Sequence, residues 1–177
     1  MPLGNLIATD QQSAPKSEQD MPLAHSVLAN VMDPEVPVVS VVDLGIVRGL
    51  SWREGHLHVL ITPTYSGCPA TEVIETSIRD ALVQSGFVST QVEQRLDPAW
   101  TTDWITDEGR EKLKAYGISP PVGSADKRSL TAEKPVVLCP ICDSKNTLQI
   151  SEFGSTACKA LYRCNDCLEP FDYFKCI

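Results

Sequence analysis

Hydrophobic residues near the N-terminus first recur with the period of a helix. Leu23, Val27 and Val31 lie four residues apart in the stretch DMPLAHSVLANVMDPE, which predicts a helix that buries this face. Asp20 is placed to cap its start, and Pro34 ends it, because a proline disfavours helical geometry at the preceding residue. We therefore expect the first element to be a helix packed through its Leu and Val side chains.

The next hydrophobic positions change to the period of a strand. Leu57, Val59 and Ile61 alternate with other residues in HLHVLIT, which predicts a strand with one buried face. An earlier strand is expected around residues 46–52, and the segment REG between the two supplies a turn. The two strands are thus predicted to form a hairpin.

The stretch PATEVIETSIRDALVQSGF carries the clearest helical pattern of the chain. Pro69 suits the first turn of this helix, and Gly86 suits its end. The predicted buried stripe consists of Ile74, Ile78, Ala81 and Leu82. A third strand is expected in STQVEQRLDPAW, and a last helix, capped by Thr106, in TDEGREKLKAYG. The order α, β, β, α, β, α predicts an α+β fold class with helices packed on one small sheet.

The remaining segments divide the chain into domains. Residues 1–20 are polar and without a period, which predicts a disordered tail before an α+β domain at 21–117. Residues 118–135 carry three prolines and small polar residues, which predict a linker. Residues 136–177 combine strand-forming residues with cysteines and are predicted to form a small all-β domain.

Composition and charge narrow the classes of partner. The formal net charge is -8, the acidic residues are spread along the chain and no Lys/Arg run occurs, so nucleic acid and anionic membrane surfaces are not expected to bind. No apolar stretch reaches the roughly 18 residues of a membrane span, and the N-terminus lacks the pattern of a signal peptide. We expect a cytoplasmic protein with protein partners. Its oligomeric state, a homodimer included, is left open.

The C-terminal region carries two CxxC pairs that predict a metal site. Cys139 and Cys142 form one pair, Cys164 and Cys167 the other, with 21 residues between them. In a cytoplasmic chain such pairs indicate a metal site rather than disulfides, and four thiolates at tetrahedral corners suit structural Zn²⁺. The metal would stabilise a zinc ribbon that is too small to fold on its own core. Iron in a rubredoxin-like site is the alternative, because the same ligands suit both metals.

Three further cysteines have two interpretations each. Cys158 and Cys176 are either small buried side chains or additional metal or cluster ligands. Cys68, in TPTYSGCPATE, lies at or beside a predicted helix N-terminus, where free N–H groups and the helix dipole favour a thiolate. It is either a functional thiol that binds a soft metal or attacks an electrophile, or a small residue at a tight strand-to-helix junction.

Other candidate residues are less specific. Asp43 lies in the segment DLG, which suits either a turn or a functional carboxylate. Trp100 and Trp104 in LDPAWTTDW suit either the core or a partner-docking face. No Ser/His/Asp arrangement, phosphate-binding glycine loop or dinucleotide fingerprint occurs, so an independent active site is not predicted.

Through these motifs together, the chain resembles the PaaD family. The resemblance rests on DPEVPVVSVVDLGIV, TPTYSGCPATE, LDPAWTTDW, YGISPP and SEFGSTACKALYRCNDCLEPFDYFKCI, and it runs from about residue 21 to the end. Members of that family are encoded with the bacterial phenylacetyl-CoA 1,2-epoxidase, a di-iron ring monooxygenase of phenylacetate degradation, as its D component.

The resemblance implies both an architecture and a role. It implies a SufT-type domain, as found in iron-sulfur assembly factors, followed by a zinc ribbon, and it singles out Cys68 and Asp43 in the first domain. It further implies an accessory or maturation subunit in which Cys68 transiently holds iron or an iron-sulfur cluster. The ribbon would dock on another epoxidase subunit or on the iron-sulfur reductase. An electron-transfer component with iron in the ribbon, and a purely structural zinc-stabilised interaction module, remain as alternatives.

Overall fold

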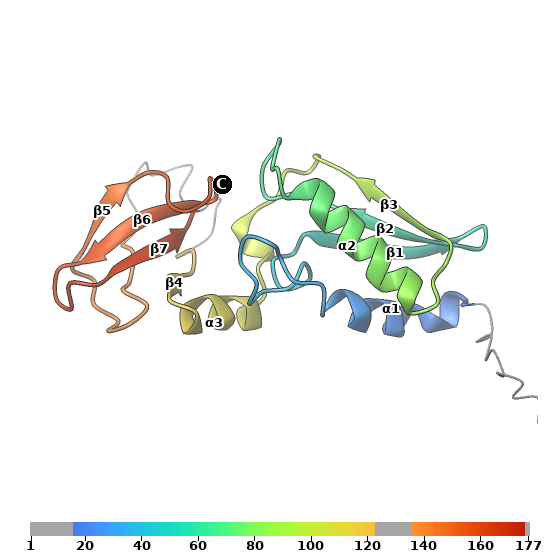
Figure 1. Ribbon diagram of the computed structural model, residues 1–177, viewed down its shortest axis with the longest axis horizontal. Helices are drawn as coiled ribbons and strands as arrows, with labels where there is room; N and C mark the ends of the chain where they lie inside the picture. Colours follow the sequence, from blue (N-terminus) through green and yellow to red (C-terminus); the bar gives the residue numbers. More distant parts are fainter. Residues whose placement is uncertain (1–15, 123–135, 176–177) are drawn as a thin grey trace, which may run out of the picture.

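The computed structural model describes residues 16–122 and 136–175, which form two modules side by side along the longest axis of the molecule (Figure 1). We call residues 16–117 the α+β module, and residues 136–175 together with Ile118 and Ser119 the ribbon module. The elements, in chain order, are the 3-10 helix η1 (Glu18–Asp20), α1 (Met21–Leu28), β1 (Val47–Arg53), β2 (His56–Ile61), α2 (Thr71–Gln84), β3 (Thr90–Gln94), the 3-10 helix η2 (Thr102–Trp104), α3 (Asp107–Ala115), β4 (Ile118–Ser119), β5 (Thr147–Ser151), β6 (Lys159–Cys164) and β7 (Pro170–Phe174).

The α+β module is a three-stranded sheet with helices on one face. β1 pairs antiparallel with β2 as the predicted hairpin, and β2 pairs parallel with β3. Leu57, Val59 and Ile61 of β2 are buried and alternate with half-buried residues, which confirms the predicted strand and its inward face. The α2 stripe is confirmed by the burial of Ile74 and Ile78 on the same side as Leu82 of that helix. The observed order of elements is the α+β order predicted from the periodicity.

Two local predictions are wrong in detail. Of the predicted face, Leu23 is 41% exposed, whereas Val27 packs against the core and Val31 is 6% exposed. The fully buried residues of α1 are Ala24 and Leu28. The helix α2 begins at Thr71 with Ala70 as its N-cap residue, so Pro69 precedes the first turn instead of lying in it.

The ribbon module is a four-stranded sheet in the order β4-β7-β6-β5. Its outer strand β4 comes directly after α3 and pairs parallel with β7, so the first residues of the predicted linker are part of a sheet. Residues 1–15 of the predicted tail and 123–135 of the predicted linker lie outside the described residues. Residues 16–20 are described, and they include η1. None of the helices in the described ranges is long and apolar enough to cross a membrane.

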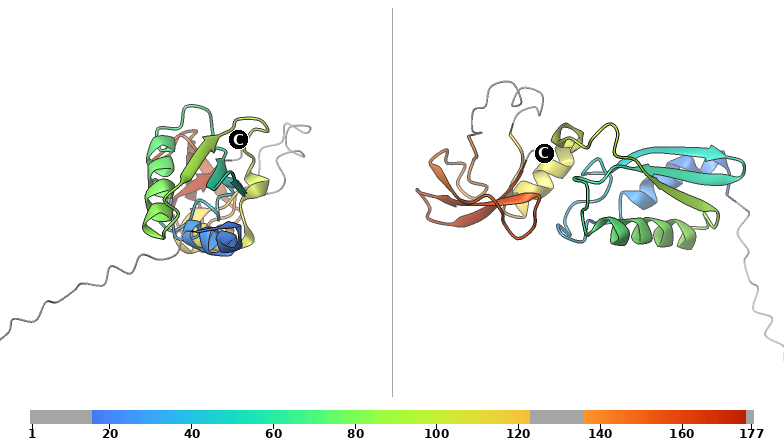
Figure 2. Two further views of the ribbon diagram at one scale, coloured as in Figure 1. Left: turned by 90° about the vertical axis from the view of Figure 1, so that its right-hand side faces the viewer. Right: turned by 90° about the horizontal axis from the view of Figure 1, so that it is seen from above.

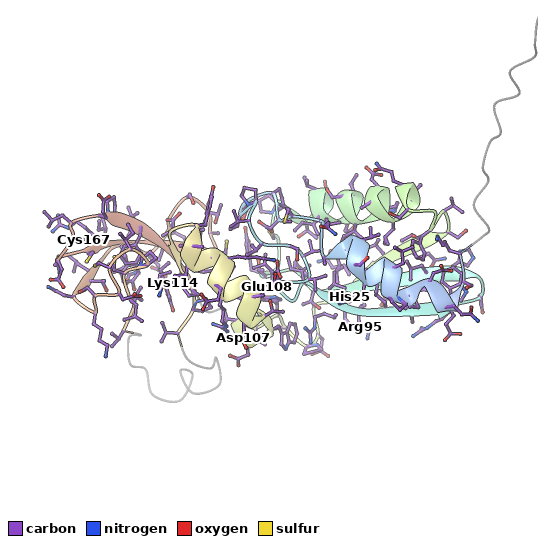
Figure 3. All side chains as sticks on the ribbon, turned by 90° about the horizontal axis from the view of Figure 1, so that it is seen from below. His25, Arg95, Asp107, Glu108, Lys114 and Cys167 are labelled. Carbon is purple, nitrogen blue, oxygen red and sulfur yellow. The ribbon has the colours of Figure 1, made fainter. Side chains whose placement is uncertain are left out.

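The two modules share a hydrophobic core. Phe174 at the end of β7 is 1% exposed and lies with its ring centroid 6.2 Å from that of Trp100 in the α+β module. Lys114 of α3 pairs with Asp143 of the ribbon module at 2.7 Å. Both Figure 1 and the view from above in Figure 2 place α3 at the junction, and Figure 3 shows Lys114 at its ribbon end. Apolar packing and an ion pair therefore connect the modules.

Candidate functional site

The four predicted metal-binding cysteines converge at one end of the ribbon module. The sulfur of Cys139 lies 3.7 Å from that of Cys167, and the sulfur of Cys142 lies 3.6 Å from that of Cys164. All four sulfurs lie within 4.8 Å of one another. A tetrahedral ion with metal–sulfur bonds of about 2.3 Å places its sulfurs about 3.8 Å apart, so the four thiols fit such an ion without rearrangement. The donor set fits zinc and iron alike.

Two turns hold these cysteines in place. Cys139 accepts a backbone hydrogen bond from Asp143, whose φ of 58° closes the first turn. In the second turn the backbone N–H of Cys167 points at the sulfur of Cys164, and it lowers the pKa of that thiol to about 7. Asp166 accepts hydrogen bonds from Ser144 and Asn146 and so ties the two turns together. At Cys164 the backbone thus favours the thiolate.

Cys68 lies in a second place, in the loop that connects β2 to α2. It is half-buried and lines a small cavity between that loop, the segment after α1 and the ribbon module. Residues that line this cavity include Asp33, Glu35, Thr64, Cys68, Cys158 and Phe174. The buried thiol of Cys158 lies 3.7 Å from Oε2 of Glu35, although the two residues are 123 positions apart in the sequence. Cys176 lies outside the described residues.

Two acidic residues, Asp33 and Glu35, line this cavity. Asp33 is buried, which raises the pKa of its carboxyl, while the backbone N–H groups of Val36 and Glu35 each donate to its Oδ1 at 2.8 Å and partly oppose that rise. Burial also raises the pKa of the Cys158 thiol to about 11. The pKa of the Tyr65 hydroxyl is raised by burial and by its hydrogen bond with Cys68. The cavity therefore combines two thiols with carboxyl groups in a largely apolar wall.

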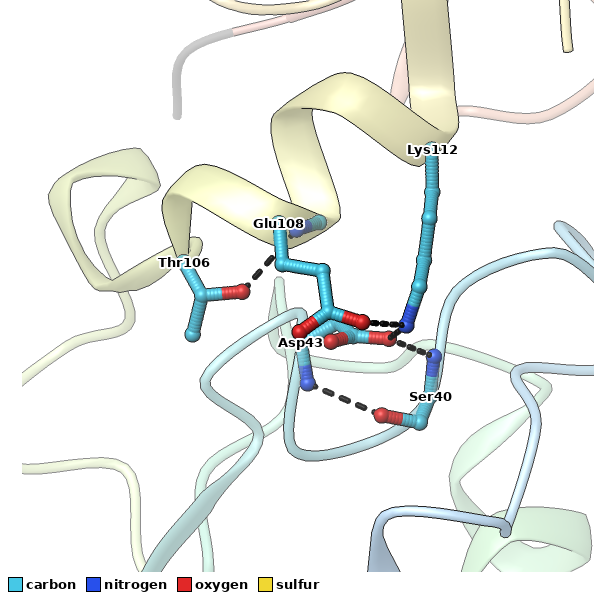
Figure 4. A network of polar contacts seen from close by, with 6 residues as sticks. Ser40, Asp43, Thr106, Glu108 and Lys112 are labelled. Atoms are coloured by element: carbon cyan, nitrogen blue, oxygen red, sulfur yellow. Dashed lines mark hydrogen bonds and ion pairs between the residues drawn. The ribbon is translucent and has the colours of Figure 1, made fainter. Parts of the chain in front are cut away.

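Asp43 is not among the residues that line this cavity. It lies in a polar network between the loop before β1 and α3, shown in Figure 4. Oδ2 of Asp43 accepts hydrogen bonds from the backbone N–H of Ser40 at 2.8 Å and from Nζ of Lys112 at 2.9 Å. Its backbone oxygen also accepts from the N–H of Thr106, the residue that caps α3 as predicted. Burial tends to raise the pKa of Asp43, but these donors outweigh it and lower the pKa overall.

The two candidate docking tryptophans have different surroundings. Trp100 is 4% exposed and donates its indole N–H to the backbone oxygen of Leu44 at 2.9 Å, so it is a core residue with no free ring face for docking. Trp104 is half-buried, and the guanidinium of Arg48 lies 3.6 Å from its ring centroid. Trp104 therefore remains the only one of the two that keeps some exposed surface.

The involvement of Glu35 and Cys158 beside Cys68 was not predicted. Nothing in the local pattern around either residue indicates that they meet, since their proximity depends on how the ribbon module packs. The one signal in the sequence was indirect, namely that the ribbon has more thiols than one tetrahedral ion requires.

Comparison with known proteins gives a consistent result. Residues 123–175 match the PaaD zinc beta ribbon domain family, and residues 25–93 match the iron-sulfur cluster assembly protein family. The chain is 54% identical, over 86% of its own length and 90% of the relative's, to an Escherichia coli (strain K12) protein named as the putative D component of the 1,2-phenylacetyl-CoA epoxidase.

More distant similarities cover about half of the chain. The chain is 36% identical, over 43% of its length and 76% of the relative's, to the Fe-S protein maturation auxiliary factor YitW of Bacillus subtilis (strain 168). A crystal structure of a DUF59 domain from Bacillus anthracis, 23% identical, superposes with a TM-score of 0.51 and covers 54% of this chain and 92% of that one. This last similarity concerns the fold alone.

Proposed function

Since the chain belongs to the PaaD family of phenylacetyl-CoA epoxidase components, we propose that it is an accessory maturation subunit of that di-iron epoxidase in phenylacetate degradation. In this role Cys68 transiently holds iron or an iron-sulfur cluster on its way to another epoxidase subunit or to the iron-sulfur reductase. The ribbon module docks the protein on that partner, and its metal is structural.

The observation that carries this proposal is the difference between the two thiol sites. The ribbon sulfurs form a closed four-thiolate set that matches a tetrahedral ion. Cys68 is half-buried at a small cavity and does not belong to any such set among the residues described. A site with fewer sulfur donors binds an ion less tightly, which suits an ion or cluster that has to be passed on.

The surface of the ribbon supports a docking role. β5 is an outer strand of its sheet, with one edge that pairs with no other strand in the described ranges. Leu148 and Ile150 on this strand, and Phe153 after it, are each more than half exposed. An outer strand with exposed apolar side chains is a surface on which another protein can add a strand or an apolar face. Trp104 stays a second docking candidate.

The decisive experiment measures what the protein does to the epoxidase. The epoxidase subunits are coexpressed with the wild-type chain, with Cys68→Ala, or with the exposed loop neighbour Ser66→Ala as a control. We expect Cys68→Ala alone to lower both the iron content and the turnover of the purified epoxidase. Equal iron content and turnover for the wild type and Cys68→Ala would refute the proposal.

The four-thiol site also supports a second candidate function, electron transfer through iron in the ribbon. Iron held by four thiolates absorbs visible light through charge transfer, whereas zinc does not. A colourless protein with one zinc per chain would exclude this function. A third candidate, a structural zinc-stabilised interaction module, predicts that Cys68→Ala leaves the epoxidase unchanged.

A further inference from the structure

We infer that the ribbon module completes the Cys68 site: Cys158 is the second thiol of a site, with Glu35 beside it, that takes a single thiophilic divalent ion such as Fe²⁺. This inference deepens the proposed function and rests on it for the role of Cys68. The ribbon then has a task beyond docking, because it supplies a ligand to the α+β module.

The backbone of Cys158 belongs to the ribbon module, but its side chain lies in the core of the α+β module. Its backbone oxygen accepts a hydrogen bond from the N–H of Lys175 at 2.9 Å, which fixes it between the start of β6 and the end of β7. Its side chain is 3% exposed and belongs to the hydrophobic core of the α+β module, and Cys68 packs against that same core. The ribbon sheet thus places the Cys158 thiol in the cavity that the Cys68 loop also lines.

The groups around the cavity have the chemistry of a soft-metal site. Cys68, Cys158 and Glu35 all line the same small cavity. Oε2 of Glu35 lies 3.7 Å from the Cys158 sulfur. Two sulfurs and one carboxylate bind Fe²⁺, Co²⁺ or Zn²⁺ in preference to Mg²⁺ or Ca²⁺, which take oxygen ligands only.

The size of the cavity limits the cargo. Its volume is about 10 Å³, which is close to the space needed by one water molecule. One ion fits such a space, whereas a cluster of several iron and sulfide ions would require the modules to separate.

The looseness of the ligand set agrees with transient binding. Within the described ranges only the four ribbon cysteines bring three or more ligand atoms within 4.8 Å of one another. The thiols and the carboxylate at the cavity must therefore draw together around an ion.

The test uses the full chain with its ribbon filled by one equivalent of zinc and Co²⁺ as the probe, under anaerobic conditions. Thiolate-bound Co²⁺ shows a charge-transfer absorption that grows with the number of thiolates. We expect the wild type to bind one Co²⁺ with such a band. Cys158→Ser and Cys68→Ser should each lower the affinity roughly tenfold or more and about halve the band, and the double variant should abolish it.

Two further variants keep the experiment decisive. Ser155→Ala, an exposed hydroxyl in the same ribbon loop, should bind Co²⁺ as the wild type does. Glu35→Gln should weaken Co²⁺ binding without losing the two-thiolate band. Retention of one zinc per chain and an unchanged circular dichroism spectrum show that each variant is folded.

The failures of the two proposals are distinguishable. If Cys158→Ser binds Co²⁺ like the wild type, or if the band persists in the double variant because cobalt has entered the ribbon, the inference is overturned. The proposed function would survive that outcome as long as Cys68→Ala still lowers the iron content of the epoxidase.

Discussion

The thiols of this protein differ in how many sulfur neighbours each one has. In the ribbon each sulfur has three neighbours within 4.8 Å, so an ion gains four bonds at once. At the cavity Cys68 has a hydroxyl, a carboxylate and one further thiol around it. Under the proposed function, the number of donors, and not the residue type, separates the ribbon site, which would retain its ion, from the Cys68 site, which would release it.

At the residue scale, Cys139→Ser should unfold the ribbon. Cys139 is completely buried, and its loss leaves three ligands for an ion whose binding free energy is also folding free energy. We expect less than one equivalent of metal per chain and loss of the β-sheet transition on heating, measured by elemental analysis and circular dichroism. Cys158→Ser serves as the matched control and should keep its ribbon metal. A fully metallated, cooperatively melting Cys139→Ser would contradict the four-ligand assignment.

Asp43 is the second residue whose chemistry leads to a prediction. Asp43→Asn removes the charge that pairs with Lys112 while keeping the shape of the side chain. We expect a loss of about 1–3 kcal/mol in the free energy of unfolding, measured by urea denaturation at neutral pH. Glu108→Gln removes the other, well-exposed partner of Lys112 and should cost less than about 1 kcal/mol. Equal effects of the two substitutions would show that the Asp43 network does not hold the loop to α3.

The same carboxyl predicts how this difference depends on pH. The folded-state pKa of Asp43 is lowered, so its contribution to stability is present above the unfolded pKa of about 3.9 and is lost as the pH falls through the folded value. The stability difference between wild type and Asp43→Asn should therefore be full at neutral pH and shrink below about pH 4. Denaturation series at several pH values would measure it, and a difference that grows on acidification would contradict the argument.

At the scale of elements, the loop before β1 depends on one glycine. Gly45 has a φ of +65°, and a Cβ on it would lie 2.4 Å from the backbone oxygen of Trp104 in η2. The segment DLG is therefore a structural junction, where the loop passes so close to η2 that no side chain fits.

We expect Gly45→Ala to lower the free energy of unfolding by more than about 2 kcal/mol, because it combines backbone strain with a clash. Gly55→Ala in the β1–β2 turn is the matched control: its φ is +80°, but nothing lies within 4 Å of the added Cβ. Gly55→Ala should lower the free energy of unfolding by about 1 kcal/mol, because it adds backbone strain without a clash. Chemical denaturation of the two variants measures the difference. Similar losses would mean that η2 moves away at little cost.

The elements also show where periodicity is a reliable guide. Alternation in β2 and the stripe on α2 predicted the buried residues because each of these elements packs along its whole length on one core. In α1 the repeat of Leu23, Val27 and Val31 was right for Val27 and Val31 but wrong for Leu23, which is 41% exposed. A short helix carries too few residues for its pattern to settle every position of the buried face.

At the scale of the whole molecule, the modules share stability. Phe174 and Cys158 belong to the ribbon by sequence but to the hydrophobic core of the α+β module by packing. Metal in the ribbon therefore supports more than the ribbon itself, because it holds β6 and β7 in the arrangement that delivers these two side chains.

Removal of the ribbon metal should accordingly loosen the α+β module. With the metal chelated, we expect faster amide hydrogen exchange in β2 and α2 as well as in β5–β7. Lys114→Ala removes only the half-exposed ion pair across the junction and should leave exchange almost unchanged. Acceleration confined to β5–β7 would show that the modules are independent.

The sequence by itself determined the features whose information is local. The two CxxC pairs predicted the four-thiol site, the periods of 2 and 3.6 predicted β2 and α2, and Thr106 predicted the start of α3, because in each case the pattern that carries the information is a short motif in the chain. These are short-range consequences of backbone geometry and of ligand spacing.

Only the tertiary structure decided which distant residues meet. It placed Cys158 beside Glu35 from 123 positions away and turned Phe174 onto Trp100. It also set Asp43 against Lys112 from 69 positions away and away from the cavity of Cys68. The physical reason is that these contacts follow from how elements pack within and between the modules, which depends on many weak contacts spread over the whole chain and on no single motif.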